Sequence, residues 1–140
     1  MIQAITSRFI PVQVHIQDQK PIFERFNAQW TPTQLVLDAD GVERHRTEGF
    51  LPVDDFLAQL DLGLGRLHFQ HEEFDKAESV LRSACDSFPK AGAAPEACYW
   101  AGVAAYKGTH DANHLAATAR RLKERYPESE WARKASVWSQ

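Results

Sequence analysis

Hydrophobic and polar residues follow one pattern before residues 50–52 and a different one after them. In the first half, short runs rich in β-branched residues are separated by turn-forming residues. Val12, Val14 and Ile16 alternate with polar residues, and this period of two predicts a strand with one buried face. Asp40-Gly41 marks a tight turn, because glycine accepts a positive φ at almost no cost. The elements expected in this half are strands at residues 9–16, 33–38 and 42–49, and a short helix at residues 21–27.

In the second half, apolar residues recur every three or four positions, which is typical of helices that bury one side. The first of these helices carries a continuous apolar stripe that begins at Val53. Pro89 and Pro127 end two of the helices, because proline cannot continue the helical hydrogen-bond ladder. Ser129 is a suitable N-cap for a short last helix. We therefore expect helices at residues 53–67, 74–88, 95–106 and 115–126, and one after Ser129.

Composition excludes several classes of function. The chain has 140 residues, of which 44% are hydrophobic and 25% charged, as in ordinary globular domains. A formal net charge of -3 gives no reason to expect a nucleic-acid partner. No apolar run approaches the roughly 20 residues of a membrane span, and residues 1–8 do not resemble a signal peptide. We expect a cytoplasmic protein with no membrane partner.

The residues that most often carry chemistry do not form a recognisable site. The histidine pairs at positions 68/71 and 110/114 have a spacing that can bind a metal, but each lacks a third ligand. A glycine-rich phosphate loop and paired carboxylates in a known setting are missing too. We therefore expect no cofactor, no metal and no catalytic residue in this chain.

The cysteines and the basic residues have structural interpretations. Cys85 and Cys98 are too few for a disulfide framework, and neither stands where a helix N-terminus would activate a thiolate. We expect both to pack as small buried thiols. Arg44, His45 and Arg46 make their strand polar, which suits the exposed edge of a sheet.

The stretch from residue 64 to residue 89 resembles a tetratricopeptide repeat. A weaker second unit spans residues 100–127, and the short helix after Ser129 would cap the stack. In such repeats small residues let paired helices approach, while large ones fill the space between them. The residues that carry the resemblance are Leu64-Gly65, Phe74, Ala77, Leu81, Ala84 and Pro89.

Residues 5–60 resemble the C-terminal portion of a thioredoxin-like domain. The resemblance rests on Trp30-Thr31-Pro32-Thr33, the apolar strand that follows, the Asp40-Gly41 turn, the charged strand and Gly49. It implies that the Thr31–Pro32 bond is cis and that the loop from Trp30 to Thr33 contacts a partner. Packing of the Trp30 side chain against Phe23 or Phe26 is favoured over exposure in this loop.

The departure from the family concerns the thiols. Thioredoxin-like domains begin with a strand and a helix that carry Cys-x-x-Cys, and residues 1–8 match at most the end of that helix. The absent strand would lie between the strands at residues 9–16 and 33–38. Three alternatives remain open: the two strands pair in a new way, a partner chain supplies the strand, or the chain is a fragment of a longer protein.

These observations predict an α+β protein. A truncated thioredoxin-like β-α-β-β-α unit is expected at residues 1–60, and an all-helical tetratricopeptide-like stack at residues 61–140. The favoured function is a redox-inactive, non-catalytic module that binds a protein or peptide, with a homodimer that completes the sheet as one form of partner. The alternative is a thiol-disulfide oxidoreductase of the thioredoxin family whose Cys-x-x-Cys lies on a segment upstream of residue 1.

Overall fold

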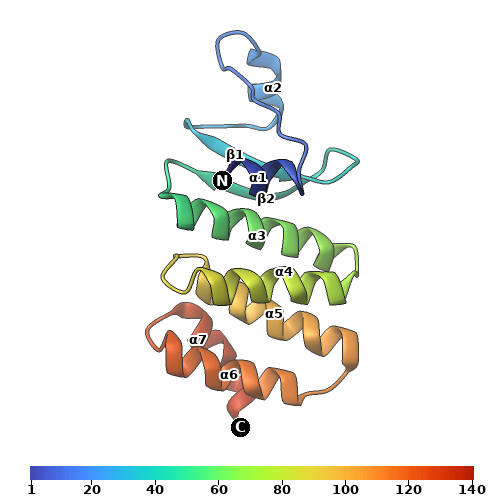
Figure 1. Cartoon of the computed structure of the whole chain (residues 1–140), viewed down its shortest axis with the longest axis vertical. Helices are drawn as coiled ribbons and strands as arrows, with labels where there is room; N and C mark the ends of the chain where they lie inside the picture. Colours follow the sequence, from blue (N-terminus) through green and yellow to red (C-terminus); the bar gives the residue numbers. More distant parts are fainter.

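The computed structural model describes residues 1–140, and its elements are stacked along one long axis (Figure 1). The N-terminal third lies at one end of this axis, and the last helices lie at the other. The helices and strands are α1 (Ile2–Thr6), α2 (Lys20–Arg25), β1 (Thr33–Leu37), β2 (Glu43–Glu48), α3 (Val53–Gln70), α4 (Phe74–Ser87), α5 (Ala94–Thr109), α6 (Asn113–Arg125), α7 (Glu130–Ala135) and the 3₁₀ turn η1 (Ser136–Ser139).

The sheet is a single antiparallel hairpin of β1 and β2, and its turn is organised by Asp38. The Oδ1 atom of Asp38 accepts hydrogen bonds from the backbone amides of Asp40 and Val42, each at 2.9 Å. Its Oδ2 atom receives the guanidinium of Arg44 at 2.8 Å. The amide of Val42 first, and the guanidinium of Arg44 with it, hold the pKa of the Asp38 carboxyl below its usual value. The predicted Asp-Gly turn is thus fixed by a carboxylate two residues before it.

Two glycines of α3 allow this helix to pack closely on both of its neighbours. A Cβ atom at Gly63 would lie 2.8 Å from Cγ2 of Val36 and 3.0 Å from Cβ of His45, which are residues of the sheet. A Cβ atom at Gly65 would collide with the buried side chain of Leu81 on α4. Helix α3 runs without a break across residues 60 and 61, where the sequence predicted the boundary between the two units. It forms the layer between the sheet and the helical stack (Figure 1).

The core of the helical stack consists mostly of small residues. Alanines at the contacts between α3, α4, α5 and α6 let these helices approach, and a few leucines fill the remaining space. The apolar stripe predicted for the first long helix is wrong in part, since Val53 is exposed and the buried positions of α3 are Ala58, Asp61, Leu62, Gly63 and Gly65. The fully buried large side chains are Leu62, Leu81 and Leu122.

The prediction that Cys85 and Cys98 are free thiols is wrong. Their sulfur atoms form a disulfide that joins α4 to α5, with 5.0 Å between the two Cα atoms. Both side chains are buried in the core of the stack. Their expected structural role stands, but they act as a covalent cross-link between consecutive helices rather than as two small apolar side chains.

The end of the chain matches the sequence pattern. Ser129 caps α7, and its Oγ atom accepts a hydrogen bond from the amide of Ala132 at 3.1 Å. Ala135 is buried, while Trp131 and Trp138 lie half-buried on the same side and cover the core. No helix combines the length and the apolar character needed to cross a bilayer.

The strand predicted at residues 9–16 is not formed. This segment has no regular secondary structure, and Ile10 and Val12 are 91% and 79% exposed. An alternating pattern yields a strand only where a neighbouring strand supplies hydrogen bonds, and β1 pairs with β2 alone. The chain is instead attached to α3 just before this segment, by Arg8, whose Nη1 atom lies 2.6 Å from Oδ1 of the buried Asp61.

Candidate partner-binding loop

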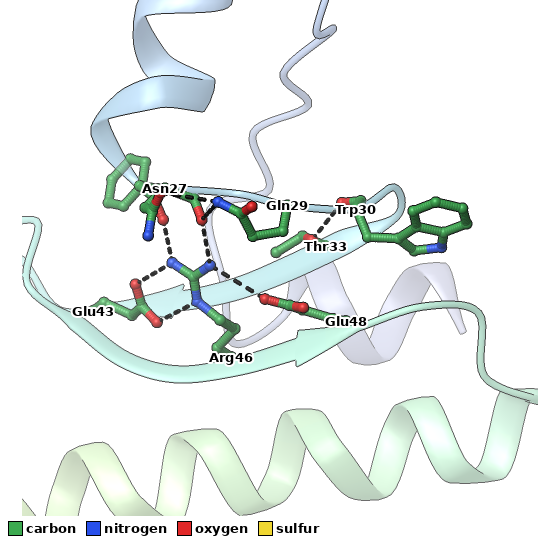
Figure 2. A network of polar contacts seen from close by, with 8 residues as sticks. Asn27, Gln29, Trp30, Thr33, Glu43, Arg46 and Glu48 are labelled. Atoms are coloured by element: carbon green, nitrogen blue, oxygen red, sulfur yellow. Dashed lines mark hydrogen bonds and ion pairs between the residues drawn. The ribbon is translucent and has the colours of Figure 1, made fainter.

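The loop between α2 and β1 holds an exposed tryptophan in a defined conformation. The hydroxyl of Thr33 donates a hydrogen bond of 2.6 Å to the carbonyl oxygen of Trp30, and the Thr31–Pro32 peptide bond is cis. Figure 2 shows the Trp30 side chain pointing away from the sheet at the end of this loop. The side chain is 68% exposed, so the expected packing against Phe23 or Phe26 is wrong.

A second aromatic residue lies at the same end of the hairpin. The amide of Gly49 donates to the carbonyl oxygen of Pro32 at 2.8 Å, which extends the β1–β2 pairing by one step. Gly49 has a φ of 90°, a conformation that residues with a side chain rarely adopt. Phe50 follows and is 83% exposed. Phe50 was not predicted from the sequence, although an aromatic residue directly after a turn glycine is a signal that could have indicated it.

Arg46 of β2 holds the chain that leads into the loop (Figure 2). Its guanidinium contacts Glu43 at 2.7 and 2.8 Å and Glu48 at 3.4 Å. It also donates to the carbonyl oxygens of Phe26 and Asn27, where α2 ends. The last carbonyls of a helix have no partner within the helix, so a cation is favourable there. Arg46 is therefore a positioning residue for the loop and more than the edge charge that its sequence context indicated.

The same contacts shift the titration of this cluster. The hydrogen bond from Arg46 is the main cause that lowers the pKa of Glu43, with the charge of Arg46 acting in the same direction.

The chain directly before Trp30 is also ordered by a side-chain hydrogen bond. The amide nitrogen of Gln29 donates to Oδ1 of Asn27 at 2.9 Å, and the backbone of Asn27 has a φ of 49°. The residues directly before Trp30 are thus tied to the sheet and to each other.

An open hollow of about 400 Å³ adjoins the loop on the side of α2. Apolar side chains form part of its wall, and the ion pair of Lys20 with Glu24, at 3.6 Å, forms another part. Its remaining wall is the chain that runs into Trp30. The residues around the hollow are Ile16, Lys20, Phe23, Glu24, Asn27, Ala28 and Gln29.

The thiols and histidines named by the sequence lie elsewhere. Cys85 and Cys98 belong to α4 and α5, two layers away from the loop (Figure 1). His68 contacts Glu73 at 3.2 Å, and His71 lies 3.5 Å from Asp38. The structure contains no group of three histidine, cysteine or acidic side chains placed to hold a metal. The groups that the loop does offer are aromatic faces and the backbone of an edge strand, and both are suited to contact with another polypeptide.

One comparison with known proteins gives a match, and it covers the N-terminal part of the chain. Residues 1–63 match the family model of a thioredoxin-like domain. This match supports a thioredoxin-like family for the segment that contains the hairpin and the loop, and it ends within α3. No curated protein and no solved structure matches the chain.

Proposed function

We propose that this protein is a non-catalytic interaction module whose thioredoxin-like part binds an extended segment of a partner protein along the loop from Trp30 to Thr33. The observation that carries the proposal is the exposure of Trp30 and Phe50 at the same end of the hairpin. Exposed aromatic side chains on a well-ordered backbone are typical anchors of protein interfaces. The free edge of β1 begins at the loop and can accept the backbone of the partner as an added strand.

We further assign α3 to α6 to two tetratricopeptide-like repeats. The support is the order of two antiparallel hairpins, α3–α4 and α5–α6, followed by the shorter α7 that covers the last one. The small residue Gly65 at the crossing of α3 and α4 fits the packing on which the resemblance rests. In this assignment the repeats are the rigid support of the loop and add a second surface for a partner.

Selection of peptides from a random library tests the proposed site directly. Peptides that bind the whole chain are measured against Trp30→Ala, Phe50→Ala and Val137→Ala, the last being another exposed apolar residue, near the C-terminal end of the molecule. We expect the first two changes to weaken binding at least about ten-fold, as truncation of an anchor does, and the third to have no effect. Peptides whose affinity is unchanged by Trp30→Ala and Phe50→Ala would refute the site.

A redox assay tests the absence of catalysis. Cys85 and Cys98 are buried and joined to each other, so we expect no reduction of a protein disulfide by the chain. Disulfide reduction that Cys85→Ser or Cys98→Ser abolishes would overturn the proposal.

The second candidate is a thioredoxin-family oxidoreductase whose thiol pair lies on a further segment of the protein. It is favoured by the Thr31–Pro32 loop, which the family places beside its cysteines, and by the match to the thioredoxin-like family model. The intact mass of the protein from its native source distinguishes the candidates. A mass clearly above 15.9 kDa, together with a Cys-x-x-Cys in the added segment, would favour the oxidoreductase.

A further inference from the structure

One arginine of the helical stack lacks the acidic partner that all comparable arginines have. Five arginines are half-buried, and four of them contact a carboxylate at hydrogen-bonding distance. Arg66 of α3 makes no hydrogen bond, and no carboxylate lies within 4 Å of it. The four paired arginines are Arg44, Arg46, Arg82 and Arg121, with Asp38, Glu43, Glu78 and Asp86 as their partners.

Arg66 is held against an aromatic residue that also has an unused donor. Its Cζ atom lies 3.8 Å from the centre of the Trp100 ring, which places the guanidinium over the face of the indole. The Nε1 atom of Trp100 is shielded from solvent and has no acceptor in the structure. A buried N–H group without an acceptor costs free energy. The guanidinium of Arg66 and the indole N–H of Trp100 are therefore two neighbouring donor groups without an acceptor.

The surroundings of this pair are aromatic and carry few acidic groups. Trp100 contacts Phe69 of α3 at a centroid distance of 5.3 Å, and Tyr99 contacts Trp131 of α7 at 5.0 Å. The acidic group that acts on Arg66 is Glu96, which does not reach it. Burial lowers the pKa of Arg66, and the charge of Glu96 offsets this only in part.

We propose that the face formed by α3, α5 and α7 around Arg66 and Trp100 binds a carboxylate side chain of an acidic, aromatic-containing polypeptide. The guanidinium of Arg66 is the group that receives the carboxylate, since arginine binds carboxylates through two parallel hydrogen bonds. The row of aromatic side chains beside it provides the apolar surface for neighbouring residues of the same polypeptide. This inference does not depend on the Trp30 loop, which lies at one end of the β1–β2 hairpin.

An NMR titration of the whole chain tests this site. The probe is a short capped peptide of alternating Glu and Phe, and its matched control replaces every Glu with Gln. We expect the Glu peptide to shift the indole N–H signal of Trp100, and Arg66→Gln to weaken binding about ten-fold, the usual loss for a charge-assisted hydrogen bond. Arg82→Gln removes an arginine that is already paired with Glu78 and should leave the affinity unchanged.

Three results would overturn the proposal: no shift of Trp100 at millimolar peptide, equal affinity for the Gln peptide, or equal losses in Arg66→Gln and Arg82→Gln. Arg66→Lys keeps the charge and the packing of the stem, so it serves if Arg66→Gln is unfolded. It should then retain the preference for the Glu peptide with reduced affinity. Trp30→Ala should not change the titration, which separates this site from the proposed function.

Discussion

The close approach of α3 to α4 at Gly65 gives a sharp test of the helical packing. In the variant Gly65→Ala the new methyl group would lie 2.6 Å from Cδ2 of Leu81 and 3.2 Å from Cδ1, and it would also overlap Cγ. Unbonded carbon atoms are most stable at about 3.5–4.0 Å. The two helices must therefore separate by roughly 1 Å, or Leu81 must leave its rotamer. Leu81 is fully buried, so its side chain cannot move out into solvent without disturbing the core.

Two opposing effects determine the size of the change. Overpacking of a core costs about 1–3 kcal/mol, whereas alanine stabilises a helix by about 0.5–1 kcal/mol relative to glycine. We expect Gly65→Ala to lower the free energy of unfolding by about 1 kcal/mol, which lowers the Tm by roughly 4 °C for a chain of this size. Urea denaturation should show a lower midpoint with an unchanged slope.

Gly108→Ala is the matched control, because Gly108 is also helical but has room for a methyl group. The added Cβ would lie 3.4 Å from Phe74 and 3.6 Å from Asp75, which are ordinary contacts. This variant should gain stability through helix propensity alone. A Tm that Gly65→Ala raises, as Gly108→Ala does, would show that the clash with Leu81 is absent.

A double variant identifies Leu81 as the cause of the destabilisation. Leu81→Ala alone should cost about 2–5 kcal/mol because it leaves a cavity. In the Gly65→Ala background the new methyl group fills part of that cavity. The loss in the double variant should therefore be smaller than the sum of the two single losses by about 1 kcal/mol. Strict additivity would mean that the clash is relieved somewhere else.

Three further predictions concern the disulfide and two carboxylates. Cys98→Ala opens the loop closed with Cys85 and should lower the free energy of unfolding by about 3 kcal/mol, as measured in urea; an unchanged midpoint would contradict the cross-link. Because Arg46 lowers the pKa of Glu43, this pair stabilises the fold above the unfolded pKa of Glu43 and ceases to do so as the pH falls through the lower folded pKa. Glu43→Gln should therefore lose less stability than the parent protein as the pH falls. The same dependence of stability on pH in both proteins would refute this prediction. Burial raises the pKa of Asp61, so its ionisation reduces stability as the pH rises above its unfolded pKa. The difference between the Tm of Asp61→Asn and the Tm of the parent protein should therefore increase as the pH rises through that range. A difference that increases as the pH falls would refute the sign.

The elements that sequence alone could predict are those fixed by nearby residues. The β1–β2 hairpin depends on the Asp40-Gly41 turn and on two runs of strand-forming residues beside it, and it formed where the pattern placed it. The end of α4 before Pro89 and the cap of α7 at Ser129 also depend on adjacent residues. In these places local preference and tertiary packing favour the same conformation.

The wrong predictions involve residues whose partners are distant in the sequence. The alternating segment at residues 9–16 remains irregular because a strand requires a neighbour that no local pattern can reveal. The bond between Cys85 and Cys98 depends on how closely α4 and α5 approach, which is set by the alanines of the core. Nothing near Arg66 in the sequence distinguishes it from other arginines, because its distinctive neighbour, Trp100, is on another helix.

Helix α3 couples the two surfaces for which binding is proposed. Gly63 brings the helix against Val36 of the sheet, and Gly65 brings it against Leu81 of α4, so that close contacts on two layers lie only two residues apart. A shift of α3 toward either layer would create a clash or open a gap, since packed cores do not deform gradually. Because Arg66 is the next residue of the same helix, its position relative to the sheet, and through the sheet to the Trp30 loop, is fixed by this packing. A partner that contacts both surfaces would therefore meet a rigid molecule and would lose little binding free energy in ordering it.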